Sequence, residues 1–172
     1  MSQPVTNLDE IKNLAADREN ENDNFRVFLK NRSSKSIDIL VHQLNDTITP
    51  QIDCTACGNC CKSLMINVTK EEADNLAKHL QTPVAELKQK YLEESTEGQM
   101  VINKIPCHFL AGTKCSIYEQ RFEGCREFPH LDKDNFTSRL FGTMMYYGVC
   151  PIIFNVVEAL KIELHFTTVT AE

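Results

Sequence analysis

The sequence predicts a small single α+β domain, built of short helices and strands that are joined by long loops. The length of 172 residues suits one domain and is enough to bury a core without disulfides. Apolar residues at helical spacing are interspersed with short alternating stretches, which indicates helices and strands mixed along the chain. Eight cysteines, four of them in one short stretch, predict that the loops are organised around sulfur chemistry.

The N-terminal part divides at about residue 35. Residues 1–35 are polar with a weak apolar pattern, so we expect a partly disordered or loosely helical extension. The domain proper would then span 36–172. Its first firm helix starts near Ser36 and ends before Pro50, because Ile37, Leu40, Val41 and Leu44 share one face.

The middle of the chain predicts strands and capped helices. Alternating apolar residues indicate a short strand over 64–68. Thr69 and Glu72 fit a capping box that starts a helix, and Pro83 suits the first position of another. Gly98 ends this region, and residues 100–105 form a candidate strand.

The C-terminal part is less regular. Residues 107–135 indicate irregular loop with a helical turn over 117–122, and residues 139–147 fit a strand or a helix. The pair Cys150-Pro151 opens a helix with an apolar face. The tail from 160 to 166 alternates, so a strand is the alternative there.

Composition and charge exclude several classes. The net charge of −6 disfavours a nucleic-acid role, which needs a surplus of lysine and arginine. The first residues lack the layout of a signal peptide, and the long uncharged run over 140–157 contains glycine and proline, as buried core does. We therefore expect a cytoplasmic protein with no membrane segment, whose close cysteines are metal ligands or redox groups.

The cysteine cluster carries the chemistry. Cys54, Cys57, Cys60 and Cys61 follow the spacing C-x2-C-x2-C-C. A two-residue gap lets one turn bring two sulfurs to a metal, and three cysteines at this spacing resemble the run that holds a [4Fe–4S] cluster in bacterial ferredoxins. Adjacent side chains tend to point apart, so we expect one of Cys60 and Cys61 to bind with the cluster and the other to serve a second metal or the core.

Four further cysteines follow downstream. With them, eight thiolates fill two four-thiolate sites, or one site with the remainder buried as small hydrophobes. Cys150 begins a helix, whose N-terminus stabilises a thiolate, and the alternative is a residue packed against the core. His108 and His130 lie near cysteines and are weaker candidates, since each is more often a hydrogen-bonded side chain. The candidate metal ligands are Cys54, Cys57, Cys60, Cys61, Cys107, Cys115, Cys125 and Cys150.

Three segments of the chain resemble a family of zinc- or iron-chelating domains with a CxxCxxCC cluster. They are CTACGNCC, PCHFLAGTKCSIYEQRFEGCREFP and Cys150-Pro151. The resemblance spans roughly Cys54 to Pro151 and implies metal chelation by the same eight cysteines. That family is related to the cysteine-rich domain of flagellin lysine N-methylases, although those enzymes are longer. Arg121 and Arg126 are candidates to offset thiolate charge, with surface ion pairs as the alternative.

The sequence leaves the choice between iron and zinc open. It also leaves open whether the chain is an enzyme. The dense cluster favours an iron–sulfur cofactor, [4Fe–4S], for redox work or cofactor support. The alternative is zinc in a structural or interaction domain, and a further alternative is a component of a protein lysine N-methylase. The expected partners are metal ions, with no nucleic acid and no membrane.

Overall fold

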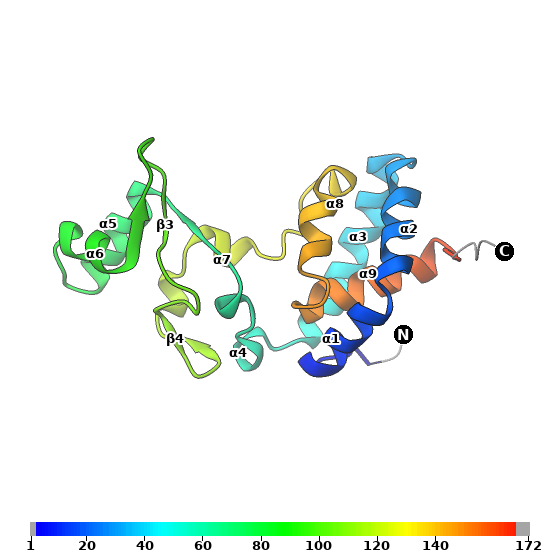
Figure 1. Cartoon of the computed structure of the whole chain (residues 1–172), viewed down its shortest axis with the longest axis horizontal. Coiled ribbons are helices and arrows are strands. Elements are labelled where there is room, and N and C mark those ends of the chain that lie inside the picture. Colours follow the sequence, from blue (N-terminus) through cyan, green and yellow to red (C-terminus); the bar gives the residue numbers. More distant parts are fainter. Residues whose placement is uncertain (1–2, 168–172) are drawn as a thin grey trace. The chain divides into compact units, whose positions relative to one another are not determined.

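The computed structural model describes residues 3–167 and has the α+β character that the sequence predicts (Figure 1). The chain forms two compact units. The helical unit comprises Met1–Asp53 and Pro129–Glu172, and the cysteine unit comprises Cys54–Phe128. Among the described residues, no helix combines the length and apolar character that crossing a membrane requires.

The helical unit is a bundle in which α3 packs against both α8 and α9, and α2 against α8 (Figure 1). Apolar side chains on one face of each helix drive this packing, since burial of such faces is the main stabilising term. The helices are α1 (Leu8–Asp17), α2 (Glu19–Lys30), α3 (Ser34–Ile48), α8 (Phe136–Met145) and α9 (Pro151–Glu163).

Helix α3 agrees with the expected helix and also caps α8. Ile37, Val41 and Leu44 are buried on the predicted face. Asp38, also buried, accepts hydrogen bonds from the backbone N–H groups of Asn135 at 2.9 Å and Phe136 at 2.8 Å. A carboxylate from another helix thereby satisfies donors that the first turn of α8 leaves open.

The N-terminal residues, expected as a partly disordered or loosely helical extension, form two helices in the structure. Helices α1 and α2 are regular, and they bury Ile11, Phe25 and Leu29. The helices are polar on average, but these few apolar residues recur at helical spacing and meet α8 and α9. The boundary at residue 35 stays a prediction.

A charged cluster lies beside this bundle's core. Lys161 of α9 is buried and pairs with Glu21 at 2.8 Å and with Glu158 at 2.7 Å. The Tyr147 hydroxyl donates to the oxygen that Lys161 contacts, Oε1 of Glu158, at 2.6 Å, and Arg18 pairs with Oε2 of the same carboxylate. Each buried charge therefore has an opposite partner, as burial requires.

The cysteine unit is built on a three-stranded antiparallel sheet in the order β1-β3-β2, with two helices packed on each other beside it. The Thr69 capping box starts α5 as predicted. The core of the cysteine unit combines apolar residues of the sheet and of the two helices with Phe109, Ile117 and Phe122. The elements are β1 (Asn67–Val68), α5 (Lys70–His79), α6 (Val84–Tyr91), β2 (Leu92–Glu94) and β3 (Met100–Ile102).

The remaining expectations for local structure are resolved as follows. Residues 139–147 are mostly helical, within α8, and α9 continues to Glu163, so the strand alternatives are wrong. The expected irregular stretch contains a hairpin of β4 (Leu110–Ala111) and β5 (Lys114–Cys115), then η3 (Tyr118–Gln120) and α7 (Glu123–Glu127). These elements are too short to leave a periodic signal.

Candidate metal centre

The cysteine cluster folds as two short turns of helix. The first turn, α4 (Cys54–Cys57), carries one cysteine at each end, and the second, η2 (Cys60–Lys62), begins with the adjacent pair. The backbone N–H groups of Ser63 and Leu64 both donate to the Cys60 carbonyl, at 3.0 and 2.8 Å. Such tight turns bring cysteines at two-residue spacing to the same side of a loop.

Gly58 joins the two turns and lies directly against the β4–β5 hairpin. Its φ angle is +59°, and a Cβ atom built there would stand 2.4 Å from the carbonyl oxygen of Thr113. Only glycine combines this left-handed backbone with so close an approach. The first cysteine segment is thereby held on the hairpin that carries Cys115, and α4 contacts β5.

A second backbone contact joins the two halves of the motif. The N–H of Cys107 donates to the Cys61 carbonyl at 2.8 Å, although the two residues are distant in sequence. In the hairpin, Cys115 pairs with Leu110 across the strands. Cys107, Cys115 and Cys125 all pack against the core of the cysteine unit. The core thus presents the later cysteines to the first cluster.

Helix α7 brings the third of these later cysteines, and Glu72 anchors it. Oε1 of Glu72 accepts the N–H of Glu123 at 2.6 Å, while Oε2 accepts the N–H of Thr69 at 2.9 Å. Burial by itself raises the pKa of Glu72, but the hydrogen bonds from Glu123 and Thr69 outweigh it and lower that pKa. One carboxylate therefore closes the start of α5 and of the helix that contains Cys125.

The adjacent pair of thiols shares one proton unequally. The thiol of Cys61 donates to Cys60, which lowers the pKa of Cys60 to about 6. The same hydrogen bond, with burial and the nearby charges of Cys107 and Cys115, raises the pKa of Cys61. Cys60 is thus the more acidic thiol of the pair, and a thiolate is the form that binds metal.

The neighbouring cysteines also affect the pKa values of Cys107 and Cys125. Burial raises the pKa of Cys125 to about 12, and repulsion by Cys107, Cys60 and Cys115 adds to it. Burial also raises the pKa of Cys107, again with Cys115 and Cys60 contributing. Five thiols from two distant segments therefore lie close enough to repel one another as anions, which a metal cation would offset.

Arg121 supplies a positive charge that acts on this group. Its guanidinium lies 3.8 Å from the centroid of the Tyr118 ring, and its charge favours the thiolates of Cys60 and Cys125. The backbone carbonyl of Arg121 accepts a hydrogen bond from the guanidinium of Arg126. Arg121 therefore matches the expected charge-offsetting role, while Arg126 acts on the backbone and on Glu72.

The other predicted residues lie as follows. Cys150 belongs to the helical unit, is buried, and precedes α9 at its N-terminus as predicted. His108 contacts Asn103 at 2.6 Å, and the His130 carbonyl accepts from Arg139. As the side chains stand in residues 3–167, no group of three or more His, Cys, Asp or Glu residues is placed to hold a metal ion.

Sequence analysis missed two residues that shape the centre. Glu72 was expected only as half of a capping box, and Thr113 was not singled out. Their roles depend on contacts with Glu123 and Gly58, which lie far from them in sequence. The one available signal was Gly58 itself, because a glycine between cysteines indicates an unusual backbone or a close approach.

A comparison with protein-family models matches residues 53–141 to CxxCxxCC, described as "Putative zinc- or iron-chelating domain". The chain belongs to this family. Its match covers seven of the eight cysteines, all in the first and second segments described above. No curated protein matches the chain. No solved structure matches it either.

Membership identifies metal chelation as the function class of the matched segment. The match begins just before α4 and continues through α7 into α8, so it contains the whole cysteine unit. Its description names zinc and iron as alternatives. The family therefore supports a metal-binding domain of the CxxCxxCC type.

Proposed function

We propose that this CxxCxxCC domain holds an iron–sulfur cluster of the [4Fe–4S] type through cysteine thiolates. The observation that carries the proposal is the proximity of Cys60, Cys61, Cys107, Cys115 and Cys125 within the cysteine unit. These residues come from both cysteine segments, and the Cys61–Cys107 backbone hydrogen bond supports their proximity. When bound, such a cluster supplies one-electron transfer or structural support for a reaction.

The proposed ligands are drawn from all eight cysteines: Cys54, Cys57, Cys60, Cys61, Cys107, Cys115, Cys125 and Cys150. The five electrostatically linked thiols have the strongest support. The contact of α4 with the strand of Cys115 supports Cys54 and Cys57 as ligands. Cys150 rests on the sequence motif alone. Binding requires thiol side chains to rotate toward a common centre, because no three His, Cys, Asp or Glu side chains within residues 3–167 are placed to hold a metal ion.

The donor set suits the cluster chemically. Iron–sulfur clusters take thiolate ligands, and the C-x2-C-x2-C run gives three of them on one short loop. Metal binding deprotonates thiols, so a bound cation would offset the burial that raises the pKa of the half-buried Cys125 and Cys107. Arg121 offsets part of the remaining negative charge.

Zinc is the second candidate, because the family description names it beside iron. Four thiolates at tetrahedral geometry form a common structural zinc site, often with ligands from two separate loops. Cys115 in the β4–β5 hairpin and the cysteines of α4, which contacts β5, would suit that arrangement. Zinc would organise the loops and carry no electrons.

Elemental analysis of the full chain, purified without oxygen, separates the two candidates. An iron–sulfur protein is brown and contains iron and acid-labile sulfide in comparable amounts. A colourless protein with stoichiometric zinc and no iron would replace the first candidate by the second. A protein with neither metal would reject both.

Single serine variants then test the ligands. Cys60→Ser and Cys125→Ser should each lose most of the bound metal, because each removes a thiolate from a different segment. His79→Ala is the control, since His79 is exposed on α5 and is not a proposed ligand. Retention of full metal content by both serine variants would contradict the proposed ligand set. Cys150→Ser tests the one proposed ligand in the helical unit.

A further inference from the structure

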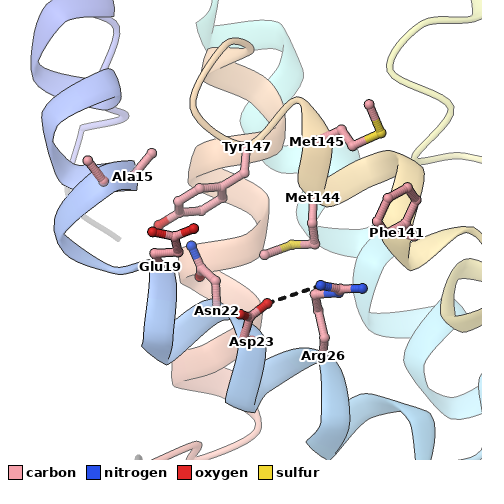
Figure 2. Close-up of a pocket in the computed structure, with 10 residues that line it drawn as sticks. Ala15, Glu19, Asn22, Asp23, Arg26, Phe141, Met144, Met145 and Tyr147 are labelled. Atoms are coloured by element: carbon pink, nitrogen blue, oxygen red, sulfur yellow. Dashed lines mark hydrogen bonds and ion pairs between the residues drawn. The ribbon is translucent and has the colours of Figure 1, made fainter.

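A groove of about 400 Å³ lies in the helical unit, between the face of α2 and that of α8 (Figure 2). All of its lining residues belong to this unit, so the groove is separate from the cysteine centre. Its size falls within the range of ligand sites in proteins. Two walls of different chemistry face each other across it.

The α8 wall is apolar and exposed. Phe141, Met144 and Met145 line it, and the side chains of Phe141 and Met145 are 65% and 62% exposed. An enclosed small-molecule site buries most of its ligand, which walls so exposed cannot do. Flexible methionine side chains beside an aromatic ring are typical of surfaces that accept a helix from another protein.

The α2 wall is mainly acidic. Glu19 and Asp23 are exposed and one helical turn apart, and both line the groove. Arg26 is the lining cation; it pairs with Asp23 at 3.0 Å, and its guanidinium lies 5.3 Å from the Phe141 ring centroid. Because that cation is already partnered, the exposed Glu19 favours a basic ligand.

The inner part of the groove holds a polar side chain with unused hydrogen-bonding capacity. Asn22 is only 7% exposed and lines the groove, and its Oδ1 has no hydrogen-bond partner among the described residues (Figure 2). The Nε of Arg26 is likewise buried without a partner there. Buried polar groups are rarely left unpaired, and exceptions often mark a site completed by a ligand.

We propose that this groove docks a basic, amphipathic helical segment of a partner protein. The segment's apolar face would cover Phe141, Met144 and Met145. Its lysine or arginine side chains would approach Glu19 and Asp23. If the side-chain amide of Asn22 rotates, polar side chains of the segment would reach it. Shape and charge favour this occupant over a small molecule, for which the groove is too open, and over an acidic segment.

The test uses the full chain in its metal-loaded form and two synthetic model helices, labelled for fluorescence anisotropy. One helix carries leucine on one face and lysine on the other, and the second replaces lysine by glutamate. The leucine–lysine helix should bind and the leucine–glutamate helix should not. Phe141→Ala should weaken binding about tenfold, as loss of an aromatic anchor does. Glu19→Gln should weaken it less and reduce its salt dependence.

Ile162→Ala is the matched control, because Ile162 is exposed on α9 and does not line the groove. It should bind the leucine–lysine helix as the unchanged protein does. Equal losses in Ile162→Ala and Phe141→Ala, or no binding at all, would overturn the proposal. Sedimentation of the chain alone adds one outcome: a dimer that Phe141→Ala dissociates would assign the groove to a second copy and also overturn it.

Discussion

Oε1 of Glu72 accepts a hydrogen bond of 2.6 Å from the backbone N–H of Glu123, and this contact ties the capping box of α5 to the helix of Cys125. Because α7 is only one turn long, its position depends on such contacts rather than on its own helical hydrogen bonds. The geometry of the proposed metal centre therefore depends on a residue that contributes no ligand.

Glu72→Gln should lower the free energy of unfolding by about 1 kcal/mol, because the charged acceptor is lost. The folded-state pKa of Glu72 is lowered, so its stabilisation is complete above the pKa of the unfolded chain. It is lost as the pH falls from that value through the lowered folded-state pKa. Denaturant unfolding of both proteins across acidic pH should show the difference shrinking as the pH decreases.

Glu71→Gln is the control for this series, since Glu71 is exposed on the same turn of α5. Its unfolding should follow the unchanged protein at every pH. A difference between Glu72→Gln and the unchanged protein that stays constant through the acidic range would contradict the assigned role of the carboxylate.

Gly58→Ala should destabilise the cysteine unit by more than about 2 kcal/mol and reduce its metal content. The new Cβ would meet the Thr113 carbonyl at 2.4 Å on a backbone with φ of +59°. Thermal unfolding and elemental analysis measure the two effects. Gly98→Ala is the control for backbone strain, because Gly98 also has a positive φ, of +79°, but has open space around it. Any additional effect at Gly58 therefore comes from the close approach to Thr113. If the two variants behaved alike, the close approach to Thr113 would have no role.

Asp38→Asn should destabilise the helical unit by about 1 kcal/mol, because a buried charged acceptor for two backbone N–H groups becomes neutral. Guanidinium unfolding followed by circular dichroism gives the change. Asp46→Asn on the exposed side of α3 is the comparison and should leave the midpoint unchanged. A loss of the same size at Asp46 would indicate a general charge effect rather than capping of α8.

Asn22→Leu should raise the stability of the helical unit by about 1 kcal/mol. The substitution replaces a buried amide that has an unpaired Oδ1 with an apolar side chain of similar size. Differential scanning calorimetry measures the shift in Tm. Asn24→Leu, exposed on the same helix, should give no such increase. A decrease in Tm for Asn22→Leu would mean that the amide is satisfied in solution.

Removal of the metal should loosen one unit and not the other. Metal-binding free energy is partly folding free energy for the loops that supply ligands. Hydrogen exchange after treatment with a chelator should therefore accelerate within Cys54–Phe128. Helices α3 and α9 should stay protected, because their apolar faces form a core of their own. Equal acceleration in both units would show that the two fold as one.

Several features could be predicted from the sequence because their causes are local. The face of Ile37, Val41 and Leu44, the Thr69–Glu72 capping box and proline at the start of α9 each lie within a few residues. The cysteine spacing, together with the residues around the later cysteines, identified the family, since turns that bind metal constrain neighbouring residues. The α+β class followed from the same periodicities.

Only the tertiary structure decided how these pieces meet. The regular helices at 8–30, the pairing of Leu110 with Cys115 and the anchoring of α7 by Glu72 depend on contacts between distant segments. Short elements carry too few residues for a period to emerge, and a polar helix needs a partner surface before its few apolar residues become decisive. Sequence therefore determined the chemistry of the cysteines, while long-range packing decided which of them share a neighbourhood.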